Sequence, residues 1–427
     1  MKDKRILMIL NEFPPTAQSG VQRGLKFLKY AVRFGWEAHV IAPKSPIRKT
    51  LDQSLMAEIP PEANVYRVAG LGLKVVSESK MVHARFKETA PKQLYIRLFW
   101  AAVKLINDLL FPYDKQIGWM PFALFKAIQL IRKHKLRNVF ISAFPYSAFL
   151  VGIALKFLYK DRIFWIADYR DAWQFSPLLD RYVLPFRHRI ICRTDDLILR
   201  TCDMALFTTE KTRLRYVETH SWLKDKSQSI TNGFDEDDFC RNGISQINAK
   251  SFKDFSLVYM GKLHISYGSP IPLLEAMKQS KMPQSRMIHI GSADSAVLNT
   301  IVKEGYSNYS FEGYKTHSEA LNYSSGADIN LIILSDAPGS ETCFPGKLFE
   351  LIRIGKPILA IGPRTSVIED VLSSTRSGKY CYREDIPGIV SSLNEIINHA
   401  EVFQAKPDAI KQYSREVLAA KLLKLYG

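Results

Sequence analysis

The sequence RILMILNEFPPTAQSGVQRGLKF, residues 5–27, decides the fold class of this chain. Its apolar run, Arg5–Leu10, predicts a buried β-strand, and the residues after Gly20 have the periodicity of a helix. A strand, a glycine-containing loop and a helix in this order are typical of parallel α/β layers. Such a loop places free backbone N–H groups at a helix start, where an anion can bind. The loop lacks the GxGxxG and Walker patterns, so an ordinary turn glycine at Gly20 stays an alternative.

The same alternation of strand and helix continues along the chain, and several apolar runs are continuous enough for strands covered on both faces. Further strands are expected at Ala38–Ala42, Val139–Ser142, Ile163–Ala167, Met204–Thr208, Ser256–Met260, Met287–Ile290, Ile329–Leu334 and Pro357–Ile361.

A polar, turn-rich stretch at 235–256 interrupts this pattern and predicts a domain boundary. We therefore expect an α/β protein of two facing Rossmann-like domains, with ligands at the carboxyl ends of the strands. The expected ranges are 1–240, 241–406 and a closing helix at 407–427, which includes the helical stretch Pro407–Tyr426.

Composition indicates a folded chain with large cores, since 47% of the 427 residues are hydrophobic and 24% are charged. The five cysteines include no CxxC pair and no zinc spacing, which favours a reducing compartment. The apolar part of MKDKRILMIL is too short for a signal-peptide core. No uncharged run reaches the length of about 20 residues that a membrane-spanning helix needs.

The positive charge is confined to the first half of the chain. Residues 1–200 carry 33 Lys and Arg against 16 Asp and Glu, a balance of +17, whereas residues 201–427 carry 26 of each. A one-sided basic field attracts phosphate-rich partners, either nucleic acid or anionic lipid. A solvated basic surface without a partner is the alternative. The sequence shows none of the helix-turn-helix, zinc or RNA-recognition signatures, so we expect no nucleic-acid partner.

The stretch 94–136 mixes aromatic, aliphatic and basic residues and predicts two amphipathic helices around a proline-containing loop. Such a surface can lie on a bilayer. The alternative is that its apolar stripe faces the protein core.

Charged residues follow the strand WIA in the sequence WIADYRDAW, residues 165–173. Asp168, Arg170 and Asp171 are therefore expected where a buried strand ends. Two carboxylates flanking an arginine could bind sugar hydroxyls or orient an acceptor. A structural ion pair is the alternative.

In the second half, strand ends carry small and basic residues. Gly261 and Lys262 end one strand, and a lysine there can hold a pyrophosphate as a point charge. Gly291 and Ser292 end another strand, and Tyr314 follows in the sequence FEGYKTH, where its ring could stack on a base.

A helix is predicted to begin in the sequence SETCFPGKLFELIRIGKP, residues 340–357. Pro345 and Gly346 would open it and aim free N–H groups, together with Lys347, at a phosphate. Glu350, about one turn along, could accept two hydrogen bonds from a ribose diol.

Seven segments, taken in order, resemble the retaining glycosyltransferases of GT-B architecture and family 4 type, which include bacterial O-antigen, capsule and exopolysaccharide transferases. They are NEFPPTAQSGVQRG (11–24), FPYDKQIGWMPFAL (111–124), ISAFPYSAFLVGIALK (141–156), WIADYRDAW (165–173), ITNGFDEDDF (230–239), LVYMGKL (257–263) and PGKLFELIRIGKPILA (345–360). The resemblance implies an acceptor-binding first domain, a nucleotide-sugar-binding second domain, and no requirement for a metal or other cofactor.

Carried over by position, Gly20 resembles the family's glycine near the donor phosphates, and Lys262 its basic residue on the pyrophosphate. Glu350 resembles the second acidic residue of the paired-glutamate motif, which contacts the ribose. Tyr314 falls where the family contacts the base through the backbone. With the strand ends and the helix start described above, the candidate donor-binding set is Gly20, Gly261, Lys262, Gly291, Ser292, Tyr314, Pro345, Gly346, Lys347, Leu348 and Glu350. The candidate catalytic set is Asp168, Arg170, Asp171, Lys262 and Glu350.

The sequence departs from the family pattern at three places. The first glutamate of the paired motif falls on Thr342, with Glu341 one residue away. The second basic residue falls near Tyr267, for which Lys347 could substitute. The loop before Gly20 has one glycine where many members have two. The first of these departures puts recognition of the donor sugar ring in doubt.

The resemblance implies transfer of a sugar from a UDP- or GDP-sugar to a lipid-linked or polysaccharide acceptor, in the cytoplasm at the inner face of the membrane. It also explains the basic first half, which would face anionic lipid. Two alternatives remain open: a nucleotide-sugar 2-epimerase of similar fold, and a catalytically silent nucleotide-sugar-binding subunit.

Overall fold

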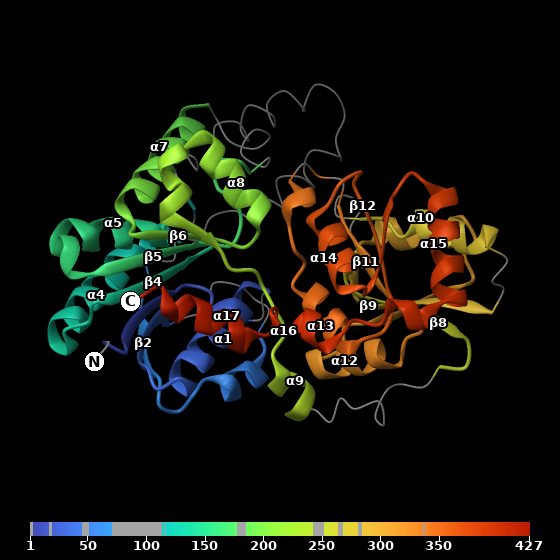
Figure 1. The fold of residues 1–427 in the computed structure, drawn as a ribbon, viewed down its shortest axis with the longest axis horizontal. Coiled ribbons are helices and arrows are strands. Elements are labelled where there is room, and N and C mark those ends of the chain that lie inside the picture. Colours follow the sequence, from blue (N-terminus) through green and yellow to red (C-terminus); the bar gives the residue numbers. More distant parts are fainter. Residues whose placement is uncertain are drawn as a thin grey trace, which may run out of the picture. The chain divides into compact units, whose positions relative to one another are not determined.

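The computed structural model describes residues 3–16, 19–44, 51–70, 113–114, 116–176, 185–241, 252–263, 268–280, 284–335, 337 and 339–427 (Figure 1). The chain divides into two compact units, one formed by Met1–Ser229 with Leu422–Gly427 and the other by Ile230–Lys421. Each unit is a parallel sheet with helices on its faces.

The sheet of the first unit has seven strands in the order β3-β2-β1-β4-β5-β6-β7. They are β1 (Arg5–Leu10), β2 (Glu37–Pro43), β3 (Asn64–Val68), β4 (Asn138–Ala143), β5 (Phe164–Tyr169), β6 (Met204–Phe207) and β7 (Ser227–Ser229). The helices between them are α1 (Ser19–Arg33), α4 (Met120–His134), α5 (Ala148–Tyr159), α7 (Pro185–Thr201) and α8 (Glu210–Thr219). Short 3-10 helices are η1 (Gln53–Glu58), η2 (Ile117–Trp119), η3 (Lys160–Arg162) and η4 (Ser221–Lys226).

The sheet of the second unit has six strands in the order β10-β9-β8-β11-β12-β13. They are β8 (Phe255–Leu263), β9 (Ser285–Ala293), β10 (Tyr309–Gly313), β11 (Ile329–Ile333), β12 (Ile358–Gly362) and β13 (Gly378–Tyr382). The helices are α9 (Glu236–Arg241), α10 (Ile271–Gln279), α11 (Ser295–Lys303), α12 (His317–Gly326), α13 (Lys347–Ile354), α14 (Val367–Thr375), α15 (Ile386–Asn398), α16 (Pro407–Lys411) and α17 (Arg415–Lys424). Two 3-10 helices, η6 (Ser340–Thr342) and η7 (Ala400–Phe403), complete it.

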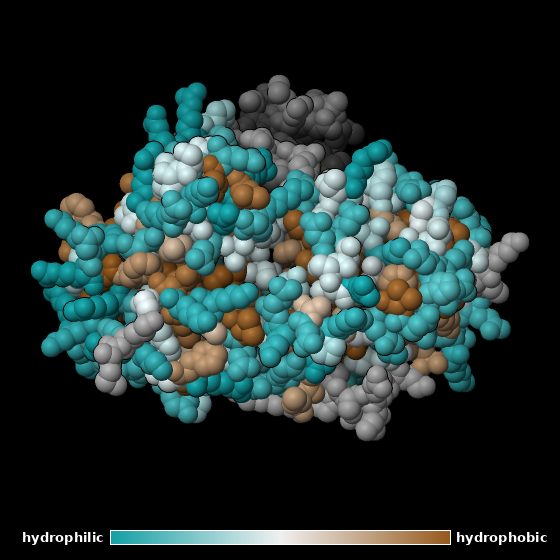
Figure 2. Space-filling view, viewed as in Figure 1, coloured by the Kyte–Doolittle hydropathy of each residue, from teal (hydrophilic) through white to brown (hydrophobic). Residues whose placement is uncertain are grey.

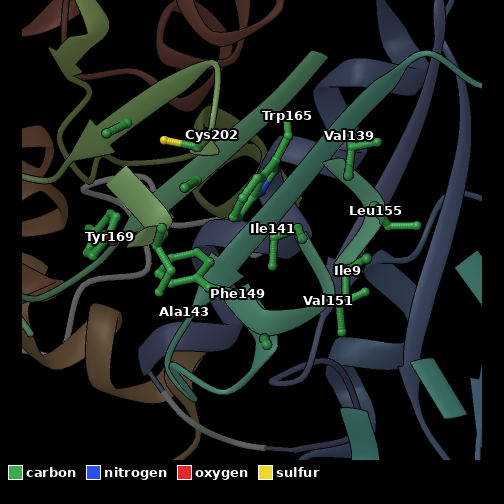
Figure 3. Close-up of a cluster of buried hydrophobic side chains, with 14 of the residues drawn as sticks. Ile9, Val139, Ile141, Ala143, Phe149, Val151, Leu155, Trp165, Tyr169 and Cys202 are labelled. Carbon is green, nitrogen blue, oxygen red and sulfur yellow. The ribbon is translucent and has the colours of Figure 1, made fainter. Parts of the chain in front are cut away.

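The central strands are buried on both faces, which explains their continuous apolar runs. In β8, Val258 and Met260 pack with α12, α13 and α14, whereas the alternate residues Leu257 and Tyr259 pack with α10, α11 and α15. In the first unit, one face of the sheet carries the cluster of Figure 3, to which β1, β4, β5 and α5 contribute Ile9, Ile141, Trp165 and Phe149. Both are therefore open sheets whose central strands are covered on both faces.

A glycine allows α5 to pack closely on β5. A Cβ atom on Gly152 would lie 2.1 Å from Cζ2 of Trp165, a ring that is fully buried. Since core packing leaves no such space, the helix can approach the strand at this distance only with glycine at that position.

All nine strands predicted from apolar runs are confirmed; β1 has the predicted bounds, and the ends of the others differ by at most three residues. The four strands that the apolar runs did not predict are β3, β7, β10 and β13, and these are the two outermost strands of each sheet. An edge strand is covered less completely and needs fewer apolar residues, so its sequence carries a weaker signal.

The two units differ in detail from the ranges expected from the sequence. Residues after Ser229 belong to the second unit, where the backbone of Phe234 pairs with Tyr413 and Arg415 at N–O distances of 3.1 and 2.7 Å. The same pairing interrupts the single helix expected at 407–426, which is observed as α16 and α17. The chain end returns to the first unit, where the Tyr426 hydroxyl donates to the carbonyl of Val139 at 2.9 Å.

Of the two amphipathic helices expected in 94–136, the first lies outside the described residues and the second is α4. Its buried residues, among them Ala127 and Ile131, pack on the core, as the alternative interpretation expected. Phe125 nevertheless remains 73% exposed on the same helix. Among the described residues, no helix combines the length and hydrophobicity that crossing a membrane requires.

Candidate functional site

The strand order of each sheet reverses direction at one point, between β1 and β4 in the first unit and between β8 and β11 in the second. In doubly wound sheets, ligands bind at the carboxyl ends of the strands beside such a point. The predicted site residues lie at these two edges, and each edge is described by itself.

Arg170 joins three strand ends of the first unit. It follows β5, and its guanidinium donates to the carbonyls of Ala143 and Phe144 after β4, at 2.6 and 2.9 Å. A further nitrogen donates to the Glu12 carboxylate, just after β1, at 2.8 Å. Its side chain is largely buried. Arg170 thus fixes the edge where the sheet order reverses.

Gly20, in the first turn of α1, lies against this ion pair. A Cβ atom there would fall 1.4 Å from Nη1 of Arg170 and 2.2 Å from Oε2 of Glu12. The glycine expected to bring a helix start close to a ligand is therefore also needed for contact between Arg170 and Glu12.

The two aspartates after β5 have different surroundings. Asp168 is fully buried and accepts hydrogen bonds from Arg23 at 2.7 Å and from the hydroxyl of Ser142 at 2.7 Å. This arrangement is the structural ion pair that the sequence left open as an alternative. Asp171 is accessible to solvent, although the atoms packed around its carboxyl desolvate it and raise its pKa, and it is the carboxylate of this motif that a bound molecule can reach.

Asn11 is a polar residue of the same edge that the sequence analysis did not single out. It directly follows β1 and is 3% exposed, and among the described residues neither its side-chain oxygen nor its nitrogen has a hydrogen-bond partner. A buried amide without partners is costly, so it is a candidate for contact with a ligand. In the sequence, Asn11 could have been found as the polar residue that directly follows the first apolar run.

In the second unit, two facing glycines bring the ends of β8 and β9 together. Gly261 pairs with Gly291, and a Cβ atom on Gly291 would lie 2.1 Å from the carbonyl oxygen of Gly261. Both have positive φ, 150° and 134°, which glycine tolerates without strain. The residues that follow, Lys262 and Ser292, are exposed and paired in register.

Lys347, the first residue of α13, extends to the end of β8. Its Nζ donates to the carbonyl of Met260 and lies 3.7 Å from the ring centroid of Tyr259. Burial lowers the pKa of Lys347 to about 7, and the nearby Glu350 carboxylate offsets only part of this effect. An ammonium held at a strand end without a full ion pair is suited to a ligand that brings negative charge.

A histidine beneath Lys347 supports the same edge. His289 is fully buried in β9, and burial together with the charge of Lys347 lowers its pKa to about 4. Its Nε2 lies 2.9 Å from the carbonyl of Gly261, so this nitrogen carries the proton, and Nδ1 accepts from the Tyr309 hydroxyl at 2.6 Å. The imidazole therefore stays neutral and fixes the carbonyl of Gly261.

Glu350 lies one turn along α13 from Lys347, and its carboxylate is 3.1 Å from Nε2 of His317. Electrostatic interaction between Lys347 and Glu350 confirms that both side chains lie near one place. Lys262 belongs to the strand end that Lys347 contacts. The structure thus gathers the residues at the end of β8 and at the start of α13.

The remaining candidates differ in what they present to solvent. Gly346 is exposed and Pro345 half-buried at the start of α13. The Leu348 side chain is fully buried in the core, and its N–H donates to the carbonyl of Pro345 at 3.0 Å, so neither group is open to a ligand in this structure. Tyr314, after β10, is 71% exposed, with a ring face free to stack.

No protein-family model matches the sequence, and no curated protein matches it either. Solved structures with the same fold are found at low sequence identity. Sucrose-phosphate synthase from Thermosynechococcus elongatus has a TM-score of 0.62 at 12% identity, covering 99% of this chain and 98% of that chain. HepE from Anabaena, solved with UDP-glucose, has a TM-score of 0.61 at 13% identity, again covering 99% of this chain and 98% of that chain.

WaaG, a glycosyltransferase involved in lipopolysaccharide biosynthesis, has a TM-score of 0.54 at 11% identity, with 99% of each chain covered. The structural neighbours are thus glycosyltransferases of GT-B architecture. The expected fold class, two Rossmann-like α/β units, is confirmed.

Proposed function

We propose that the protein is a glycosyltransferase that moves a sugar from a UDP- or GDP-sugar to an acceptor hydroxyl. The observation that carries the proposal is the edge of the second unit where Lys347 lies against β8, next to Lys262 and one turn before Glu350. These groups offer two positive charges for a diphosphate and a carboxylate for a ribose diol. The shared fold supports the proposal.

Transfer requires that the bond between the anomeric carbon and the diphosphate oxygen breaks while negative charge grows on the leaving group. Lys262, Lys347 and the N–H groups at the start of α13 would stabilise this charge. The acceptor oxygen bonds to the anomeric carbon on the same face, and its proton passes to the departing phosphate. The configuration is then retained, and neither a protein nucleophile nor a metal ion is required.

In the first unit, we propose that Asp171 and Asn11 contact the acceptor, because Asp171 is exposed and Asn11 has no partner among the described residues. Arg170 and Gly20 act through the geometry of this edge. Asp168 would contribute only by holding Arg23 in place.

The donor site is tested by replacing Glu350 with alanine and measuring binding of UDP- and GDP-sugars by calorimetry. We expect the affinity to fall at least tenfold, because the ribose loses its acceptor of hydrogen bonds. Glu369 is a matched control, since it is an exposed acidic residue in the first turn of the neighbouring helix α14. Equal donor affinity and transfer rate for Glu350→Ala and Glu369→Ala would remove Glu350 from the site.

We further propose that the acceptor is a lipid-linked glycan or polysaccharide and that the first unit works at an anionic membrane surface. Most of the face in Figure 2 is hydrophilic, with hydrophobic residues scattered over it. Among the exposed hydrophobic residues, Phe157 and Leu158 lie near the end of helix α5, where they are 82% and 55% exposed and are followed by the exposed Lys160 and Arg162. Apolar insertion next to basic residues is typical of interfacial binding.

Flotation with vesicles of neutral or anionic lipid tests this part separately. We expect binding to anionic vesicles that weakens as salt rises and that is reduced in the Phe157→Ser, Leu158→Ser double variant. Val302→Ser, which changes an exposed residue of the second unit, should bind as the wild type does. Binding that ignores lipid charge and salt would contradict the membrane proposal and leave the donor proposal intact.

A further inference from the structure

We propose that Glu37, His39 and His134 form a binding site for a divalent transition-metal ion of the Zn²⁺ type at the amino-terminal edge of the first sheet. These residues take no part in the sites described above, which lie at the carboxyl ends of the strands. The ion would join the start of β2 to the last residue of α4.

The sequence brings the ligands together in two steps. Glu37 and His39 are two residues apart on β2, so their side chains leave the strand on the same side. The His134 ring lies on that side, with its centroid 4.3 Å from the centroid of the His39 ring. One strand and one helix end thus supply two imidazoles and a carboxylate, a ligand set that suits zinc and its neighbours and not Ca²⁺ or Mg²⁺.

The separations of the ligand atoms fit a single ion. Oε1 of Glu37 is 2.9 Å from Nε2 of His39 and 3.9 Å from Nδ1 of His134. One ligand atom of each residue lies within 4.8 Å of the other two. Two ligands at tetrahedral zinc bond lengths are roughly 3.4 Å apart, so small side-chain rotations would complete the site.

The surroundings prepare both imidazoles for metal binding. Nδ1 of His39 is 3.2 Å from the Tyr66 hydroxyl, an outer contact that fixes the ring and leaves Nε2 for the ion. Burial lowers the pKa of His39, which favours the neutral form that a metal needs. Within the described residues, Nε2 of His134 is buried without a hydrogen-bond partner, and Nδ1 faces the Glu37 carboxylate at 3.9 Å. Nδ1 is therefore the nitrogen that would coordinate the ion.

Charge and access also fit a cation. Glu37 is 49% exposed on its side chain, which opens a path from solvent. Arg5 is the nearby positive group, and Asp3 holds it through hydrogen bonds of 2.7 and 3.1 Å. Arg5 also donates to the carbonyl of His134 at 2.9 Å, which fixes the helix end that carries the ligand.

The test uses the full chain, freed of metal with a chelator and then titrated with Zn²⁺, with Co²⁺ as a spectroscopic probe. We expect about one ion per chain, visible absorption bands of tetrahedral Co²⁺, and a higher melting temperature with Zn²⁺. His134→Gln and Glu37→Gln should bind Zn²⁺ at least tenfold more weakly. Both replace side chains that are partly exposed, whereas His39 is fully buried and is left unchanged.

His399→Gln is a matched control. Its Nδ1 is 3.8 Å from Oε1 of Glu401, a similar pair on the surface of the second unit, and among the described residues no third ligand forms a cluster with it. This variant should bind Zn²⁺ as the wild type does. No binding by the wild type, or equal binding by all variants, would overturn the proposal. Donor affinity is a separate readout, which these changes should leave unaltered.

Discussion

At the scale of single residues, Gly20 shows how one missing atom shapes the first unit. Its hydrogen occupies the place where a Cβ atom would overlap the Arg170 guanidinium and the Glu12 carboxylate. The position is therefore restricted by a side-chain ion pair, whatever ligand the loop also binds.

Replacing Gly20 with alanine should break contact between Arg170 and Glu12 and lower the free energy of unfolding by about 1–3 kcal/mol, as overpacking does. Urea denaturation measures the change. Gly24→Ala, one turn further along α1, is the control, since the nearest atoms that a Cβ atom there would meet belong to the apolar Leu10 side chain, at 3.0 Å and more. Equal effects of the two changes would show that the ion pair is not the reason for Gly20.

Asp168 and Asp171 should separate into a structural and a functional residue. Asp168→Asn removes the buried carboxylate charge that lies 2.7 Å from the Arg23 guanidinium and should cost about 3–5 kcal/mol of stability. Asp171→Asn should leave stability within about 0.5 kcal/mol, because the side chain is exposed, and should raise KM for the acceptor. Unfolding curves and kinetics of both variants decide between them, and a stable Asp168→Asn with lost activity would reverse the assignment.

At the scale of elements, the contact between α13 and β8 links donor binding to pH. The pKa of Lys347 is lowered to about 7 by burial, so its charge is lost as pH rises through neutrality. A UDP-sugar keeps its diphosphate charge across this range, and only the protonated lysine attracts it. Donor affinity should therefore be highest at acid pH and fall as pH rises.

Between pH 6.5 and 8.5 we expect the donor Kd to rise roughly 25-fold, which follows from the protonated fraction of a group with a pKa near 7. Lys347→Arg should abolish this slope, since arginine stays protonated. Calorimetry at several pH values measures both. Lys262→Met is the control, expected to weaken binding at every pH while the slope remains. A slope that persists in Lys347→Arg would assign the titration to another group.

At the scale of the whole molecule, the chain end belongs to the unit in which the chain begins. Tyr426 donates to Val139 in β4 and lies 5.9 and 5.7 Å, between ring centroids, from Trp36 and Phe164. The last residues, Leu422–Gly427, thus belong to the first unit and complete its packing near the starts of β2, β4 and β5.

Tyr426→Ala should destabilise the first unit by about 2 kcal/mol, because a packed ring and a hydrogen bond are lost. All six tryptophans lie within residues 1–229, so their fluorescence during urea unfolding reports this unit alone. Tyr314→Ala, which removes an exposed ring of the second unit, should leave that transition unchanged. Unaltered tryptophan unfolding in Tyr426→Ala would show that the chain end is not needed.

The sequence by itself determined the α/β class and the central strands, because a strand covered on both faces, such as β1 or β11, must be apolar throughout. It also placed the polar residues after these strands, which parallel sheets collect at one edge. The outer strands β3, β7, β10 and β13 left little trace, since their exposed sides accept polar residues.

Only the tertiary structure decided what each polar residue does, because partners distant in the chain set its charge and access. Asp168 and Asp171 are three residues apart, yet Asp168 is fully buried and paired with Arg23, whereas Asp171 is accessible to solvent. Burial lowers the pKa of Lys347, and this burial arises where its side chain packs against Tyr259 and Met260, almost 90 residues earlier in the chain. His39 meets His134 in the same way. Local sequence patterns predict secondary structure and burial. Contacts between side chains that are distant in the chain form only when the sheet is assembled.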